Sequence, residues 1–405
     1  MKSTITALSM LAMAVAQQVG TEQSETHPRL NWQRCTSGSC SNVNAEVVID
    51  ANWRWIHEVG GYRNCYEGNS WTGLCSGADD CAKNCAVEGA DYGNTYGVST
   101  SGNALTLKFV QQHGFGKNVG SRMYLMNGDS KYQTFTLLNN EFAFDVDLST
   151  VECGINSALY FVAMKEDGGL SSETNNKAGA KYGTGYCDAQ CARDLKFIGG
   201  KGNIAGWNSS ETDNNAGDNN YHICEDDTCG GTYSEDRYGG GCDANGCDYN
   251  PYRMGNRDFY GPGKTIDTTR KFTVVTRFEP DRMYQVFIQD GRTITVPGAK
   301  WAGIPETSDI TRSFASLIGG YPKLNAALEI PMTLVMSIWS DHYANMLWLD
   351  STYPPERAGE PGTERGPCAP TSGVPAEVIE QFPNARVVWS NIRFGPIGST
   401  YNIAT

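Results

Sequence analysis

The chain has 405 residues and a formal net charge of −13 at pH 7, from 32 basic and 45 acidic side chains. This acidic balance argues against nucleic acid or an anionic membrane surface as a partner, and it suits a neutral polymer substrate. Gly occurs 46 times and aromatic residues make up 11% of the chain, which favours a turn-rich fold with many ring surfaces. The length is compatible with one large domain or with two.

Residues 1–16 have the pattern of a secretory signal peptide. Lys2 is followed by an apolar run that ends in the small residues Ala14 and Ala16, so we expect cleavage before Gln17 and a secreted, extracellular protein. The run is too short for a membrane span, which needs about 20 apolar residues. In an oxidising compartment the 14 cysteines predict disulfides, and the five histidines lack ligand spacing, so we expect no metal and no cofactor. Asn208-Ser-Ser210 is the only glycosylation sequon.

The hydrophobic pattern along the chain has mostly period two. Candidate strands are residues 105–109, 132–137, 141–147, 272–278 and 386–394, and Asp290-Gly291 is a strong turn signal between strands at 284–289 and 293–296. Helical signals are few and short, near residues 81–87, 324–328 and 375–382. Many strands with little helix predict an all-β fold of two packed antiparallel sheets, as a sandwich or jelly roll.

Several ordered motifs resemble those of family 7 glycoside hydrolases, the fungal cellobiohydrolases that hydrolyse cellulose. They lie at residues 182–231, 49–57, 141–147, 247–256, 345–353 and 390–399. The resemblance implies a concanavalin A-like jelly roll with long tunnel-forming loops, built as one catalytic domain over residues 17–405 without a cellulose-binding module. It also implies a retaining, monomeric enzyme acting on β-1,4-glucan chains. The loop from Cys229 to Cys242 is similar to those that roof the tunnel of the chain-end-acting members.

The resemblance also indicates which side chains bind the sugar. A flat aromatic ring binds glucose by covering its apolar face, while the hydroxyls of the sugar reach polar neighbours. By resemblance, Trp55 is a platform at the tunnel entrance with Trp53 beside it, and Trp339 and Trp348 flank the point of cleavage. Polar groups that would line the sugar subsites are Asn156, Tyr160, Tyr186, Asp188, Gln190, Arg237, Asp248, Arg253 and Arg365. For Asp194 and Lys196 a solvated loop or an ion pair is at least as good an interpretation.

The catalytic motif of the family is absent. Retaining hydrolysis needs two carboxyl groups about 5–5.5 Å apart, and the family carries them in Glu-x-Asp-x-x-Glu, on a strand that would fall between Gly217 and Asp218. No such triplet occurs in the sequence. The nearest substitutes are Glu141, Asp145 and Asp147, which alternation places on one strand face, and Glu211 with Asp213. We interpret the first set as structural and the second as loop residues, so no catalytic residue is assigned.

The cysteines support a missing segment. Family pairing implies bridges Cys35–Cys40, Cys65–Cys85, Cys75–Cys81, Cys153–Cys368 and Cys224–Cys229, and it leaves Cys187, Cys191, Cys242 and Cys247 without partners. These four lie near two gaps relative to the family, one at 217–218 and one within 309–324.

Three hypotheses therefore stay open. The first is a cellulose hydrolase recorded through an incomplete gene model or splice form. The second is a catalytically inactive cellulose-binding relative that keeps the aromatic platforms. The third is a different β-sandwich lectin, which only the generic features of the sequence support.

Overall fold

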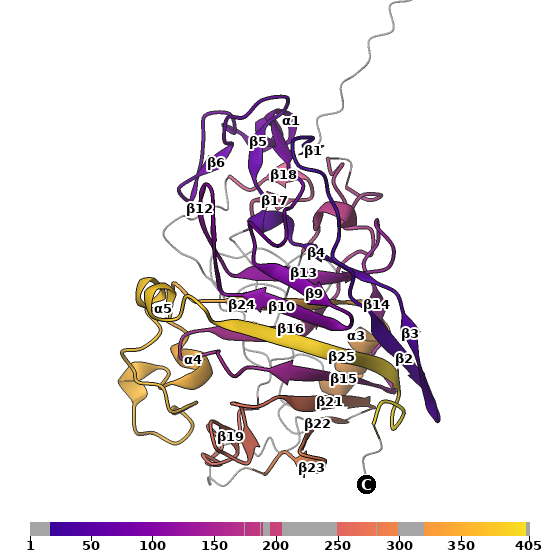
Figure 1. Ribbon diagram of the computed structural model, residues 1–405, viewed down its shortest axis with the longest axis vertical. Helices are drawn as coiled ribbons and strands as arrows, with labels where there is room; N and C mark the ends of the chain where they lie inside the picture. The colour runs from indigo at the N-terminus through magenta and orange to yellow at the C-terminus, as the bar shows by residue number, and fades with distance from the viewer. Residues whose placement is uncertain are drawn as a thin grey trace, which may run out of the picture.

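Two mostly antiparallel sheets form the body of the molecule in the computed structural model (Figure 1). The structure describes residues 17–173, 175–186, 188, 195–204, 249–280, 282–298 and 320–401. The predicted signal peptide and the junction at Gly217 and Asp218 lie outside these residues. Within the described part, no helix is long and apolar enough to cross a membrane.

The larger sheet has nine strands among the described residues. Its path runs β23 (Arg292–Thr295), β22 (Arg282–Gln289), β21 (Phe272–Glu279), β15 (Asn140–Asp147), β25 (Arg386–Pro396), β10 (Ala104–Lys108) and β9 (Val98–Ser101), and β2 (Trp32–Thr36) pairs with both β25 and β3 (Ser39–Val43). The β22–β23 turn is formed by Asp290 and Gly291, both with positive φ, at 52° and 73°. Two positive φ values are what a two-residue hairpin turn requires, so the predicted hairpin is confirmed.

The smaller sheet has five strands among the described residues. Its path runs β14 (Thr134–Phe135), β24 (Met332–Trp339), β13 (Ser121–Met126) and β4 (Glu46–Ile49), and β16 (Asn156–Val162) pairs with the other side of β24. The outer edge of β4 is covered, because Val47 N donates to Pro28 O and Leu30 N donates to Ala45 O. The structure shows no such cover for β16 among the described residues, so β16 is an edge strand of this part of the chain.

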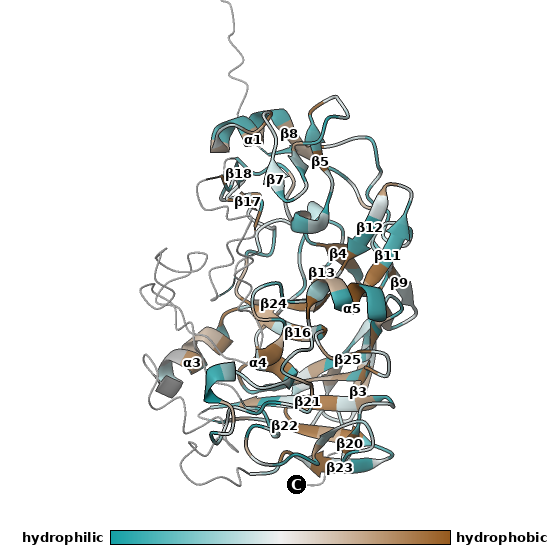
Figure 2. Cartoon of the chain, turned by 90° about the vertical axis from the view of Figure 1, so that its left-hand side faces the viewer, coloured by the Kyte–Doolittle hydropathy of each residue, from teal (hydrophilic) through white to brown (hydrophobic). Residues whose placement is uncertain are grey.

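The main core lies between the two sheets. Strand β24 contributes Leu334, Met336 and Ile338 to it, whereas Val335 belongs to a second apolar cluster on the opposite face. The same alternation holds in β13, where Met123 faces the main core. Figure 2 shows hydrophobic residues gathered on the strands of the sheets and hydrophilic residues on the hairpin of β11 (Val110–His113) and β12 (Gly116–Val119). We call the face of the smaller sheet turned away from the main core the site face.

A small lobe lies above the two sheets in Figure 1. It contains β1 (Gln18–Val19), β5 (Ile56–Glu58), β6 (Tyr66–Glu67), β7 (Ser70–Trp71), α1 (Ala78–Asn84), β8 (Cys85–Val87), β17 (Phe197–Ile198) and β18 (Lys201–Gly202). The prediction of a helix over residues 81–87 is wrong at its end, because residues 85–87 form strand β8. The pairing of β8 with both β1 and β5 overrides the local helical signal there.

The remaining elements are short. They are α3 (Gly320–Glu329), α4 (Leu347–Asp350), α5 (Pro375–Gln381), the 3-10 turns η1 (Ala51–Trp53), η2 (Ala180–Tyr182) and η3 (Pro355–Arg357), and the strand pair β19 (Tyr260–Gly261) and β20 (Ile266–Asp267). Helices α3 and α5 confirm the other two helical predictions. The predicted strand at 132–137 is reduced to β14 and a single bridge at Tyr132.

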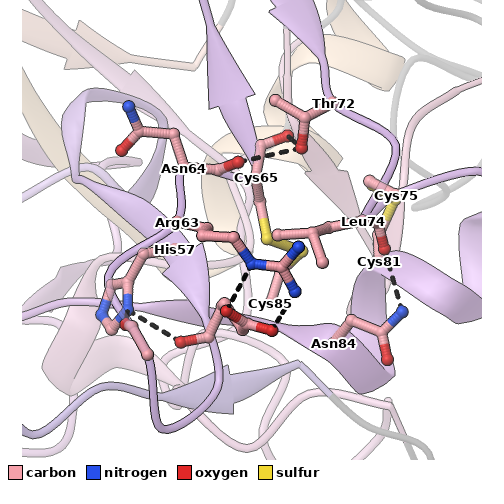
Figure 3. The surroundings of a disulfide bond; sticks show 12 residues. His57, Arg63, Asn64, Cys65, Thr72, Leu74, Cys75, Cys81, Asn84 and Cys85 are labelled. Atoms are coloured by element: carbon pink, nitrogen blue, oxygen red, sulfur yellow. Dashed lines mark hydrogen bonds and ion pairs between the residues drawn. A yellow bond between two sulfur atoms is a disulfide. The ribbon is translucent and has the colours of Figure 1, made fainter.

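Four disulfides follow the predicted pairing. They join Cys35 to Cys40, Cys65 to Cys85, Cys75 to Cys81 and Cys153 to Cys368. Two of them hold the small lobe together, where Figure 3 shows Cys65–Cys85 and Cys75–Cys81 close to His57 and Asn84. The predicted Cys224–Cys229 bridge and the four cysteines left without partners lie outside the described residues.

Candidate functional site

The site face carries a network of one cation, two carboxylates and three phenols. Arg122 Nε donates to Asp50 Oδ2 at 2.9 Å, and the Tyr124 hydroxyl donates to the same oxygen. The guanidinium group of Arg122 also lies over the ring of Tyr186, 3.4 Å from its centroid. The hydroxyls of Tyr160 and Tyr186 are 2.8 Å apart. These side chains share a face because alternate residues of a strand point the same way.

Burial keeps the phenols of this network neutral. It raises the pKa of Tyr160 to about 12 and the pKa values of Tyr124 and Tyr186 well above their usual value. Burial acts to lower the pKa of the Arg122 guanidinium. The nearby Asp50 and Tyr124 outweigh this effect and hold the pKa above its ordinary value, so Arg122 keeps its charge. Tyr124 and Tyr186 are buried, so among the three phenols only the partly exposed Tyr160 is placed to meet a sugar hydroxyl, with which a neutral phenol can exchange hydrogen bonds.

Asn156 and Trp339 lie opposite each other where β16 and β24 meet. The rings of Trp339 and Trp348 are 6.1 Å apart at an angle of 32°. Trp339 is half-buried, whereas Trp348 is buried and donates from Nε1 to Asp341 Oδ2 at 2.8 Å. Asp341 thus orients Trp348, and Trp339 presents the more accessible ring.

The other two tryptophans follow the end of β4. Asp50 caps the turn η1 by accepting from Asn52 N at 2.6 Å, which brings Trp53 beside the hairpin β11–β12, where Trp53 Nε1 donates to Val119 O at 3.3 Å. The guanidinium of Arg122 lies 5.3 Å from the Trp53 ring, so Trp53 borders the network on the site face. Trp55 belongs to the small lobe and is half-buried.

Trp55 has partners on its edge and on its faces. Its Nε1 donates to Asn64 Oδ1 at 2.8 Å, and its ring stacks on His57 at 3.9 Å between centroids. The exposed ring of Tyr62 lies almost parallel to it at 6.4 Å. The two predicted platforms Trp53 and Trp55 therefore have different surroundings, although they are only two residues apart.

Two further predicted residues come from loops that meet beyond β24. Arg253 Nε donates to Gly362 O at 2.9 Å. Asn250 Nδ2 donates to Arg365 O at 2.8 Å, which ties the loop after Tyr249 to the loop at 354–370. Lys196 lies over the Tyr66 ring, 4.5 Å from its centroid, and its Nζ donates to Asn52 O, contacts that are neither those of a solvated loop nor an ion pair, while Asp194 lies outside the described residues.

Asp188 accepts a hydrogen bond from the Tyr186 hydroxyl at 2.5 Å, as a member of the site-face network. Three other predicted subsite residues, Gln190, Arg237 and Asp248, lie outside the described residues. The alternative pair Glu211 and Asp213 also lies outside them.

Glu141 and Asp145 belong to β15 in the larger sheet, whereas the site face belongs to the smaller sheet. Glu141 is fully buried and accepts from Arg277 Nε at 2.9 Å, Gly398 N at 2.8 Å and Thr400 N at 2.7 Å. A carboxylate with both oxygens engaged in this way is a structural anchor. The geometry therefore agrees with the interpretation of Glu141 as a structural residue. The described residues do offer one cluster with metal-ligand spacing, but it consists of Asp350 and the disulfide-bonded Cys153 and Cys368.

Sequence reasoning missed several residues that organise the site. Arg122, Tyr124 and Asp341 carry no motif signal, because their role depends on strands that are distant in the sequence. Asp50 and His57 fall inside the motif at 49–57, but nothing local distinguishes them from framework positions.

A jelly roll of two sheets, with tryptophan rings and neutral hydroxyls on one sheet face, defines a carbohydrate-active β-sandwich protein. The family model of Glycosyl hydrolase family 7 matches residues 19–221 and 216–401, so the chain belongs to glycosyl hydrolase family 7. The two matched segments meet at 216–221, the place where the missing segment is predicted.

Solved structures of the same family cover almost the whole chain. A cellobiohydrolase from Melanocarpus albomyces, complexed with cellotetraose, is 59% identical over 96% of this chain and 100% of its own, with a TM-score of 0.89. A family 7 cellobiohydrolase from Daphnia pulex is 40% identical over 95% of this chain and 100% of its own, with a TM-score of 0.85. An endocellulase from Humicola insolens is 33% identical over 95% of this chain and 100% of its own, with a TM-score of 0.78. The chain is thus more similar to these cellobiohydrolases than to the endocellulase.

Proposed function

We propose that this protein is a secreted, monomeric cellulase of the retaining cellobiohydrolase type, with one domain over residues 17–405. We further propose that the 405-residue chain, which lacks the catalytic motif, binds β-1,4-glucan chains without hydrolysing them, and that only a longer form containing the motif would be active. The observation that carries the binding half is the site face, where Trp339 lies beside Asn156 at the head of β16 and the Arg122 network continues along the sheet. The Melanocarpus albomyces relative was solved with cellotetraose, which supports a glucan chain as the ligand.

The second half of the proposal depends on the missing motif. Retaining hydrolysis needs a nucleophilic carboxylate and a carboxylic acid about 5–5.5 Å apart, and Glu-x-Asp-x-x-Glu is absent from all 405 residues. On the site face, Asp50 is engaged by Arg122 and Tyr124 and is buried, so it is a poor nucleophile. Asp188, the other carboxylate of the network, accepts from the Tyr186 hydroxyl, so we base the proposed lack of hydrolysis on the missing motif.

The place for the missing strand is the outer edge of β16. Five consecutive residues of β16 are partly exposed, whereas six consecutive residues of its neighbour β24 are buried. A strand laid along β16 would face the same side as Asn156 and Tyr160, and its carboxylates would point toward a glucan on the site face. This placement is our explanation of how a longer form of the chain would become active.

The test compares two proteins, residues 17–405 as given and the same chain with a family segment that contains the motif inserted between Gly217 and Asp218. We expect the first to bind cellohexaose without releasing product from a soluble aryl cellobioside. The second should release cellobiose from cellulose with retention at the anomeric carbon. Turnover by the unmodified chain, or an inverted product from the extended chain, would contradict the proposal. Loss of cellohexaose binding in both would contradict the binding half of the proposal.

A further inference from the structure

The indole of Trp55 lies on a buried imidazole ring. Trp55 precedes β5 and His57 lies within it, so extended backbone places both side chains on one side of the chain. Their ring centroids are 3.9 Å apart with an angle of 23° between the planes, and His57 is only 2% exposed. The imidazole therefore covers one face of the indole and can set the plane of that ring.

The imidazole of His57 is fixed at both nitrogens. Nδ1 lies 2.7 Å from Gly61 O and 2.9 Å from Glu58 O, and Nε2 lies 2.8 Å from Glu88 Oε2. All of these partners are oxygen atoms, so the ring is held at both of its nitrogens. Turning the ring would break hydrogen bonds on both sides, which holds the plane under the indole in one orientation.

Glu88 is in turn held by the backbone. It is 1% exposed and accepts from Glu22 N at 3.0 Å, Gln23 N at 3.2 Å and Gly89 N at 2.8 Å. Burial acts to raise the pKa of Glu88, but these backbone donors and His57 outweigh it and hold the pKa below its ordinary value. Glu88 is thus a carboxylate that accepts a hydrogen bond from His57 Nε2.

A disulfide bond stabilises the strand pair that carries His57. His57 pairs with Ala86 and Glu58 pairs with Cys85 in the β5–β8 ladder, and Cys85 is joined to Cys65. Figure 3 shows His57 and Asn64 to the left of this disulfide. Since Asn64 Oδ1 also accepts from the Trp55 indole, the ring is held at its edge as well as across its face.

We propose that Glu88 and His57 are positioning residues for glucan binding, in which the carboxylate fixes the imidazole and the imidazole fixes the indole plane of Trp55. The inference rests on the proposed function, because it requires Trp55 to bind a sugar ring. Neither positioning residue contacts the sugar, since both side chains are almost fully buried. A ring that is ordered before binding loses less conformational freedom when the ligand arrives, which favours tighter binding.

The experiment measures cellohexaose affinity by calorimetry for four variants of residues 17–405. Trp55→Ala gives the full effect of losing the platform. His57→Gln keeps an amide donor toward Glu88 but removes the stacked ring, and we expect affinity to fall about three- to tenfold, in line with the usual strength of a ring stack. His57→Phe restores a flat ring but not its hydrogen bonds to Glu88 and the backbone, so it should recover only part of this loss. Glu88→Gln should give an intermediate loss, although it alters no group that touches the ligand.

His27→Gln is the matched control. His27 is also buried against carboxylates, with Nε2 3.3 Å from Glu25 Oε1 and Nδ1 3.4 Å from Glu46 Oε2, but among the described residues no tryptophan ring stacks on it. It should lower the melting temperature without changing cellohexaose affinity. Near-UV circular dichroism provides a second measurement, in which the signal of the stacked rings should weaken in His57→Gln and persist in both His57→Phe and His27→Gln.

The outcomes separate the inference from the proposed function. If Trp55→Ala weakens binding while His57→Gln binds as tightly as the unchanged chain, the positioning role is wrong and the platform stands. If Trp55→Ala binds normally, the platform itself is wrong and the inference falls with it. A His57→Phe variant that folds but fails to recover affinity would also overturn the positioning role, because the ring stack would then not determine binding.

Discussion

Replacing Arg122 by Met should destabilise the protein strongly. The Arg122 side chain is 11% exposed and Asp50 is 2% exposed, so the ion pair between them is almost fully removed from water. Without Arg122, the Asp50 carboxylate keeps the Tyr124 hydroxyl and Asn52 N as donors but loses its counter-charge. Leaving one buried charge unpaired typically costs about 3–5 kcal/mol. This is a large part of the roughly 5–15 kcal/mol that holds a domain folded.

The reverse replacement, Asp50→Asn, should cost less. The guanidinium of Arg122 would still lie over the Tyr186 ring at 3.4 Å, and a desolvated cation–π contact of this kind contributes about 2 kcal/mol. The double variant removes both charges and leaves neither unpaired. Its loss of stability should therefore be smaller than the sum of the two single losses by at least about 2 kcal/mol.

The assay is urea denaturation followed by tryptophan fluorescence, with the slope of free energy against urea compared across the four proteins. Equal slopes mean that the stabilities refer to the same unfolding reaction. Losses that add within about 0.5 kcal/mol would show that the two side chains are independent. That result would refute the argument that Arg122 and Asp50 form one buried unit beneath the site face.

Three other predictions concern single side chains. Trp55→Ala should weaken retention on crystalline cellulose more than affinity for short soluble oligosaccharides, because it removes an entrance ring; equal effects in a pull-down and in calorimetry would show that the ring is ordinary core. Burial raises the pKa of Asp350 to about 6, above its unfolded value of 3.8, so its contribution to stability is complete below about pH 4 and is lost as the pH rises through 6. Asp350→Asn should thus stabilise the fold at pH 7.5 by about 1–3 kcal/mol and not at pH 3.5. The exposed control Glu377→Gln should leave the midpoint of urea denaturation unchanged at both pH values. Glu141→Gln should lower the melting temperature by weakening the anchor to Arg277 and leave cellohexaose affinity unchanged; a selective loss of affinity would place Glu141 in the binding site instead.

The sequence predicted the sheets well, because their strands alternate strongly. Phe272–Glu279 and Arg386–Pro396 are runs rich in β-branched and aromatic residues, and the Asp290-Gly291 turn has its own local signal. The end of α1 was harder to predict, since Cys85–Val87 becomes a strand only through partners on either side. Local pattern does not contain that information.

The site was predictable where it follows a motif. Trp339 and Asn156 lie opposite each other, as residues of one binding face should. The Arg122 network and the support of Trp55 by Glu88 could not be predicted, because each joins residues 31 to 72 positions apart through contacts that only the folded chain creates. Their signals in the sequence are single charged residues, which are usually solvated.

The disulfide between Cys153 and Cys368 has a consequence for how this gene can change. It closes a loop with a sequence separation of 215 that contains β16, β24 and both predicted gaps. The entropy of closing a flexible loop depends only on the logarithm of its length, so an insertion of about 50 residues would alter it by roughly 0.2 kcal/mol. Short and long transcripts can therefore share one covalent frame. Under the proposed function, a transcript that restores the motif inside this loop would change a binding form into a hydrolytic form without rebuilding the scaffold around it.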